Sequence, residues 1–74
     1  IEKINLTLID STGGKFIITS DKAKFTTSGE LRLWNSVVII KDDEKSEYPQ
    51  ISMLYKSSKS IEIIVGSKLL HSIS

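Results

Sequence analysis

The chain has 74 residues, a net charge of +1 and no cysteine. It therefore forms one domain or part of one, without disulfides or a Cys-containing zinc site to stabilise a small core. The basic residues are scattered along the sequence, which argues against a nucleic-acid-binding surface. No apolar run approaches the about 20 residues that a membrane-spanning helix needs. Because so short a chain buries only about 60% of its unfolded surface, we expect it to associate with copies of itself or with further parts of a longer chain.

The first apolar alternation predicts a strand at about residues 3–9, where Leu6 and Leu8 are separated by Thr7. The run Asp10-Ser-Thr-Gly-Gly14 predicts a turn. The chain opens at Ile1 with neither a Met nor a signal peptide, so we expect a processed or truncated piece of a longer protein.

A second strand is predicted from Lys15 to Ser20, with Phe16 and Ile18 on its inward face. Ser20-Asp21 then interrupts the alternation, as Ser and Asp do where their side chains bond to the nearby backbone. Strand pairing is expected to resume over residues 22–26.

The next segment has the pattern of a β-hairpin. Ala23 and Phe25 alternate with polar residues before the turn Thr27-Ser-Gly29, and Leu31 and Leu33 do the same after it. One face is apolar and the other carries Lys, Arg and Thr. This pattern is typical of an antiparallel sheet with only one face buried.

Adding 30 to these positions gives a second set of anchors at Met53, Tyr55, Ile61 and Ile63, with a turn at residues 57–59. The chain thus holds about one and a half copies of a 30-residue hairpin unit, the kind of period that stacked repeats show. The alternative is that any two hairpins of similar length look alike.

The rest of the chain also predicts strands. Asn35-Ser36 is a second break, and residues 37–41 continue the parity of the preceding strand. The segment from Lys41 to Lys45 is a charged loop with too few oxygen ligands for a calcium site. Residues 47–56 form a long strand with a bulge at Pro49-Gln50, because Tyr48 and Ile51 differ in parity.

Two shorter strands at residues 61–65 and 68–73 follow, separated by Gly66-Ser67. No helical period extends over a useful length. The sequence therefore predicts an all-β chain of about six or seven strands, forming a single domain over residues 1–74.

No catalytic constellation stands out, so we expect no enzyme, cofactor or metal. His71 is alone near the C-terminus, where it reads as a strand surface residue, and none of the serines lies in a nucleophile elbow. Trp34 follows an inward Leu33 and should point away from the buried face. An exposed tryptophan can serve as a sugar platform or an interface anchor, or it can simply cover a neighbouring strand.

Three segments resemble the lipopolysaccharide-transport bridge family (LptC/LptA, OstA-like). The run Phe-Ile-Ile-Thr-Ser-Asp-Lys-Ala-Lys-Phe at residues 16–25 resembles the family's "Ile-(Ser/Thr/Ala)-(Ser/Ala)-Asp-x-Ala-x-(Tyr/Phe)" segment. Leu-Arg-Leu-Trp-Asn-Ser-Val-Val-Ile at residues 31–39 resembles "Leu-x-Leu-x-Gly-Asn-Val-x-Ile", with Asn35 and Ser36 in place of Gly and Asn. Residues 52–55, with Ile61 and Ile63, resemble the next unit. The resemblance covers about residues 6–65 and is closer to LptC than to the longer LptA.

The resemblance implies a fold and a role. The fold is an antiparallel β-jellyroll-like stack of hairpins, V-shaped with a greasy interior, of which 74 residues make a partial copy. The role is lipopolysaccharide transport across the periplasm, between an inner-membrane extractor and a periplasmic bridge. The implied partners are lipopolysaccharide, the inner-membrane transporter complex and a bridge protein or second copy joined edge to edge, with no nucleic acid. The full-length protein would be tethered to the inner membrane in the periplasm.

A lipid conduit needs an apolar groove, and one set of inward residues could line it. An ordinary sheet core would use the same set, so the sequence leaves open whether this face is a groove or a closed core. A self-assembling structural or adhesive β-repeat and a carbohydrate-binding β-sandwich using Trp34 and Tyr55 are the alternative functions. The candidate lipid-binding residues are Phe16, Ile18, Phe25, Leu31, Leu33, Val37, Ile39, Met53, Tyr55, Ile61 and Ile63.

Overall fold

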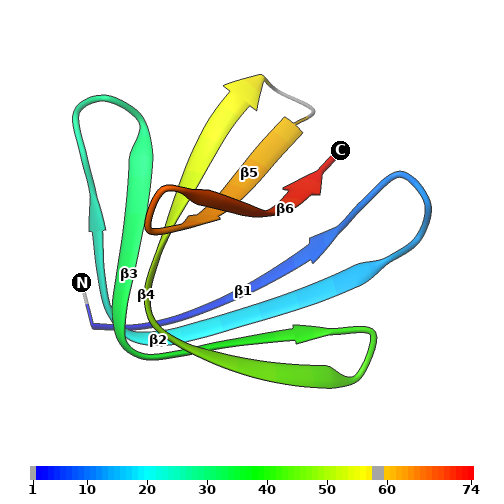
Figure 1. Ribbon diagram of the computed structural model, residues 1–74, viewed down its shortest axis with the longest axis horizontal. Helices are drawn as coiled ribbons and strands as arrows, with labels where there is room; N and C mark the ends of the chain where they lie inside the picture. Colours follow the sequence, from blue (N-terminus) through cyan, green and yellow to red (C-terminus); the bar gives the residue numbers. More distant parts are fainter. Residues whose placement is uncertain (1, 58–59) are drawn as a thin grey trace.

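A computed structural model describes residues 2–57 and 60–74. It contains one antiparallel sheet in which six strands lie side by side in chain order, so that each strand pairs with the next (Figure 1). No helix occurs among the described residues, and the prediction of an all-β stack of hairpins is confirmed. The strands are β1 (Glu2–Ile9), β2 (Lys15–Phe25), β3 (Glu30–Lys41), β4 (Glu44–Ser57), β5 (Ser60–Val65) and β6 (Lys68–Ile73).

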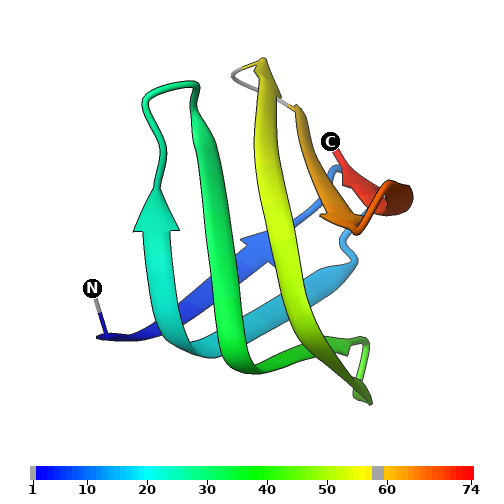
Figure 2. The ribbon, with the colours of Figure 1, turned by 60° about the vertical axis from the view of Figure 1, so that its left-hand side comes forward.

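The long strands bend, and the sheet folds into a V whose two arms face each other across the apolar interior (Figures 1 and 2). The pairing of β2 with β3 is irregular between Thr19 and Lys22, and the pairing of β3 with β4 is irregular between Trp34 and Val37. The sequence predicts interruptions at both places. In the structure the strands are continuous and the pairing shifts by a bulge at each place. A bulge bends a strand, and hydrogen bonding to the neighbouring strand resumes after it.

A buried serine holds the bend together. Ser20 is only 4% exposed, and its hydroxyl lies 2.7 Å from the carbonyl oxygen of Lys22 and 2.8 Å from that of Trp34. The contact with Trp34 joins β2 to β3 where their regular pairing is lost, and the contact with Lys22 lies within β2. The side-chain-to-backbone bonding expected at Ser20-Asp21 is thus present for Ser20.

The two hairpins related by 30 residues have the same register. Ala23 pairs with Leu33 and Phe25 pairs with Leu31 in the first hairpin. At the corresponding positions of the second hairpin, Met53 pairs with Ile63 and Tyr55 with Ile61. The predicted 30-residue correspondence therefore extends to the strand pairing. Part of its second turn, residues 58–59, lies outside the described residues.

Short turns connect the strands. The charged loop predicted over residues 41–45 is only a two-residue turn, since Lys41 already pairs with Glu44. Asp42 and Asp43 both have positive φ, 48° and 72°, as the type I′ turn that matches strand twist requires. This tight turn is why β4 begins at Glu44, three residues earlier than predicted.

The turn between β1 and β2 is held by a carboxylate. The Asp10 side chain accepts hydrogen bonds from the backbone N–H of Thr12 at 3.0 Å, from the Thr12 hydroxyl at 2.7 Å and from the N–H of Gly14 at 2.8 Å. These bonds lower the pKa of Asp10, the Thr12 hydroxyl contributing most. Gly13 has a φ of 90°, a conformation that glycine adopts without steric cost.

The outer edges of the sheet are β1 and β6. Each pairs with one neighbouring strand only, β1 with β2 and β6 with β5. The β1–β2 turn and the C-terminal residue are joined by one hydrogen bond, in which the N–H of Ser11 donates to the carbonyl oxygen of Ser74. The sheet is therefore rolled but not closed into a barrel.

Candidate functional site

The apolar interior of the V has a closed part near the bend. Its side chains come from β2 to β6 and are at most 6% exposed. Such burial leaves them no access to a ligand without an opening of the fold. Of the predicted lipid-binding residues, this part contains Phe16, Ile18, Leu33, Val37, Ile39, Met53 and Ile63. Met53 lies at the boundary, since it also lines the open pocket described next.

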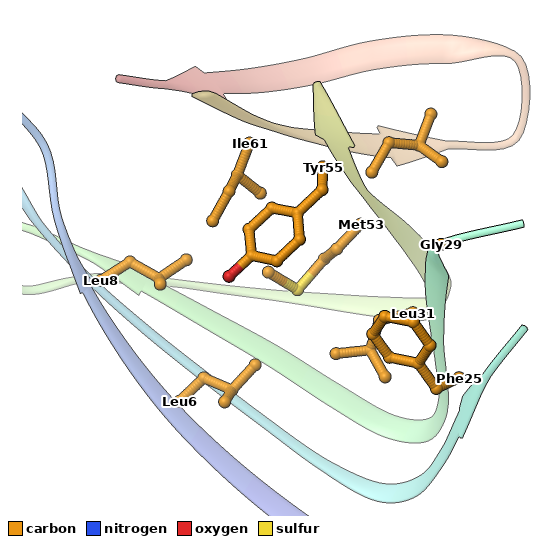
Figure 3. Close-up of a pocket in the computed structure, with 9 residues that line it drawn as sticks. Leu6, Leu8, Phe25, Gly29, Leu31, Met53, Tyr55 and Ile61 are labelled. Atoms are coloured by element: carbon orange, nitrogen blue, oxygen red, sulfur yellow. The ribbon is translucent and has the colours of Figure 1, made fainter. Parts of the chain in front are cut away.

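The other part of the interior is open, between β1, the β2–β3 hairpin and the paired segments of β4 and β5 around Tyr55 and Ile61 (Figure 3). We call this cavity of about 140 Å³ the open pocket. Phe25 and Tyr55 stand at its rim and are 59% and 69% exposed. The pocket is lined by Leu6, Leu8, Phe25, Gly29, Leu31, Met53, Leu54, Tyr55 and Ile61, none of them charged.

The sequence therefore predicts which residues face the interior of the V, but not the division of that interior into a closed and an open part. Phe25, Leu31, Met53, Tyr55 and Ile61 do line the open pocket. Leu6 and Leu8 also line the open pocket. They are not among the predicted lipid-binding residues, although their alternation predicts β1. Their place in the wall follows from the rolling of the sheet, which brings Leu6 and Leu8 of β1 opposite Tyr55 and Ile61 (Figure 3). No periodicity in the sequence predicts that contact.

Trp34 and Tyr55 lie on opposite faces of the sheet. Trp34 follows the fully buried Leu33 and is 39% exposed on the outer face, as predicted. Tyr55 lines the open pocket on the inner face. The two rings therefore cannot form one sugar-binding platform.

His71 of β6 contacts β2 across the interior of the V. Its ring packs edge-on against Phe16 of β2, with 5.1 Å between ring centroids. The ammonium of Lys41 lies 5.6 Å from the centre of the same Phe16 ring. Burial, and secondarily the charge of Lys41, lowers the pKa of His71. The histidine expected to be a lone surface residue thus has a packing partner and is partly buried.

The described part of the chain offers little other chemistry. It has no group of three or more His, Cys, Asp or Glu side chains placed to hold a metal ion. Over the same residues, no helix has the length and apolarity to cross a membrane. Comparisons with protein-family models, curated proteins and solved structures found no match for this chain.

Proposed function

We propose that this chain is a non-enzymatic lipid-binding module that passes lipopolysaccharide along an apolar β-groove in the periplasm. The observation that carries the proposal is the open pocket. Its rim exposes Phe25 and Tyr55, although a closed sheet core would bury such rings. An uncharged lining favours an acyl chain over a polar ligand.

The size of the open pocket limits what one copy can hold. Its volume of about 140 Å³ is close to that of an apolar cavity that admits a single benzene ring. A whole lipid with several fatty chains does not fit. One copy would hold part of one acyl chain, while the rest of the lipid extends through the open end towards a neighbouring unit.

The free strand edges supply a way to join such units. Both β1 and β6 have one unpaired edge, and an unpaired edge is a template for another strand. We propose that a bridge protein or a second copy adds to one of these edges and continues the groove. The motif resemblance supports a place beside the inner-membrane transporter complex, with the full-length protein tethered to that membrane.

The same edges support a second candidate function, a self-assembling structural β-repeat. In that case the rim residues Phe25 and Tyr55 would be covered by the next copy rather than by lipid. The two candidates differ in what contacts the rim, and a single experiment separates them.

The experiment places a photoreactive phenylalanine analogue at Phe25 or Tyr55, and irradiates the purified protein with lipopolysaccharide. Lipid adducts are expected at both positions. Leu69, which is 51% exposed and does not line the open pocket, is the matched control, with the exposed Lys45 of β4 as a second. Equal lipid labelling at the control positions would refute the groove, and protein–protein adducts at the rim in place of lipid adducts would establish self-assembly.

A further inference from the structure

The outer face of the sheet carries the chain's single tryptophan in a polar hollow. Trp34 is 39% exposed, and the hollow beside it measures about 570 Å³, within the about 300–1,000 Å³ typical of ligand sites. It lies across the sheet from the open pocket. We call it the Trp34 hollow; the polar and aromatic side chains that line it are Lys24, Glu30, Arg32, Trp34, Gln50 and Ser52.

Strand register arranges these residues as a grid. Trp34 of β3 lies opposite Gln50 of β4, and Arg32 of β3 lies between Lys24 of β2 and Ser52 of β4. Directly opposite residues share a face, and the two rows are two residues apart, about 7 Å along the strands. An aromatic ring, an amide and two cations are thus within reach of one small molecule.

The charges of the grid are only partly compensated. Lys24 and Arg32 are directly opposite each other, and like charges in that position destabilise an antiparallel pair. Arg32 Nε lies 3.2 Å from Glu30 Oε1, which leaves the other guanidinium donors unused in that ion pair. No carboxylate of the described residues lies within ion-pair distance of Lys24. An anion bound between the two cations would relieve this repulsion.

Glu30 orients the Arg32 side chain and adds a hydrogen-bond acceptor to the Trp34 hollow. Its side chain is only 19% exposed. A hydrogen bond from Ser52, together with the charge of Arg32, lowers the pKa of Glu30. The carboxylate is therefore ionised at neutral pH, when it can accept hydrogen bonds from hydroxyl groups but repels other anions.

We propose that the Trp34 hollow binds an anionic saccharide, one sugar ring carrying a carboxylate or phosphate. The apolar face of the ring packs on the Trp34 indole. The anionic group lies between Lys24 and Arg32 and receives charge-assisted hydrogen bonds. The amide of Gln50 and the carboxylate of Glu30 bond the hydroxyls.

A nucleic-acid strand fits the hollow less well. Single-stranded nucleic acid is held by several stacking rings and a continuous basic track. Here one indole is available, and the ionised Glu30 stands beside the cations. The pattern suits a ligand with a single anionic group and several hydroxyls.

The test uses the fluorescence of Trp34, the only tryptophan in the chain, in titrations with glucuronate and glucose 6-phosphate. A saturable change is expected with either compound, and glucose and inorganic phosphate should bind about tenfold more weakly, since each lacks one half of the contacts. An equal response to inorganic phosphate means an adventitious anion only and overturns the proposal. Tighter binding of an oligothymidylate overturns it in favour of nucleic acid.

Charge-neutral variants assign the contacts. Lys24→Gln and Arg32→Gln should each weaken glucuronate binding about tenfold. Lys45→Gln is the matched control, because Lys45 is exposed and pairs with Ile40 on the other side of the bend. Loss of binding in Lys45→Gln as large as in Arg32→Gln would refute a local site. The proposal is independent of the lipid groove, because the Trp34 hollow and the open pocket lie on opposite faces of the sheet. Phe25→Ser should therefore abolish lipid adducts at Tyr55 and leave glucuronate binding unchanged.

Discussion

Alanine substitutions at Leu33 and Phe25 should have very different effects on stability, although the two residues share one apolar face. Leu33 is 0% exposed, so Leu33→Ala loses its transfer free energy and leaves a cavity, at a cost of about 3–5 kcal/mol. Phe25 is 59% exposed. With only about two-fifths of the residue buried, Phe25→Ala should cost about 1 kcal/mol or less, since full burial of a Phe contributes about 1.5–3 kcal/mol.

The assay is equilibrium unfolding in urea. A chain of 74 residues is expected to have a free energy of unfolding of about 4–11 kcal/mol, so Leu33→Ala can remove a large part of it. With a slope of about 1 kcal/mol/M, the midpoint should fall by about 3 M or more for Leu33→Ala and by about 1 M or less for Phe25→Ala. If Leu33→Ala does not fold, Ile39→Val provides a milder core change of about 0.5–1.5 kcal/mol.

One result would refute the division of the interior into a closed core and an open pocket. If Phe25→Ala cost as much as Leu33→Ala, the Phe25 ring would be packed in solution, and the open pocket would be filled or covered. Added lipopolysaccharide gives a second readout, since a ligand at a hundred times its Kd stabilises the native state by about 2.7 kcal/mol. That gain should occur in the wild type and be largely lost in Phe25→Ser.

Three further variants test the bend, the closing strand and the first turn. Ser20→Ala should lower the free energy of unfolding by about 1–3 kcal/mol, because the carbonyl oxygens of Lys22 and Trp34 lose the buried hydroxyl that they share. The exposed Ser72→Ala should change it little in the same urea assay. The lowered pKa of His71 means that the unfolded chain takes up a proton first as the pH falls below the ordinary value of 6.5. The wild type should therefore lose stability below that pH until the folded-state pKa is passed, and His71→Gln should remove this loss from thermal melts recorded between pH 8 and pH 5. The lowered pKa of Asp10 stabilises the fold above the ordinary value of 3.8, so this contribution should disappear as the pH falls through the folded-state value; in Asp10→Asn, acid melts should lack it.

Local patterns predict the hairpins well, because each depends on residues close in sequence. The alternation of Ala23 and Phe25 before a glycine turn with that of Leu31 and Leu33 after it is enough to set the register, which the structure confirms. The parity change between Tyr48 and Ile51 predicts a bulge at Pro49-Gln50. The register does shift there, but Gln50 pairs regularly with Trp34, and the extra residue lies in β3, between Trp34 and Val37, and not in β4.

Long-range placement is what the sequence leaves open. Phe25 and Leu33 have the same chemistry and parity, and only the rolling of the sheet makes one a rim residue and the other a core residue. The same rolling brings Leu8 into the open pocket and His71 onto Phe16. These contacts join strands that are not neighbours in the sheet, so no periodicity in the sequence encodes them.

The edge of β1 should make the protein associate with copies of itself. Eight residues long, β1 has one unpaired edge, and over residues 4–9 it has neither a charge nor a proline. Charged side chains, lysine above all, and prolines are the usual protections of an edge strand. The edge of β6 is shorter, and its end is tied to the first turn through the Ser11–Ser74 hydrogen bond. The β1 edge is therefore the better template.

Thr7→Lys places a positive charge on that edge without touching the core, because Thr7 is exposed. The wild type should form dimers or longer assemblies as its concentration rises, and Thr7→Lys should shift them to monomer, as measured by size-exclusion chromatography with light scattering. Thr27→Lys makes the same change at an exposed position in the β2–β3 turn and should assemble like the wild type. If Leu70→Pro in β6 dissociates the assembly while Thr7→Lys does not, the pairing edge is β6 and not β1. A wild type that stays monomeric and folded at high concentration contradicts edge pairing altogether.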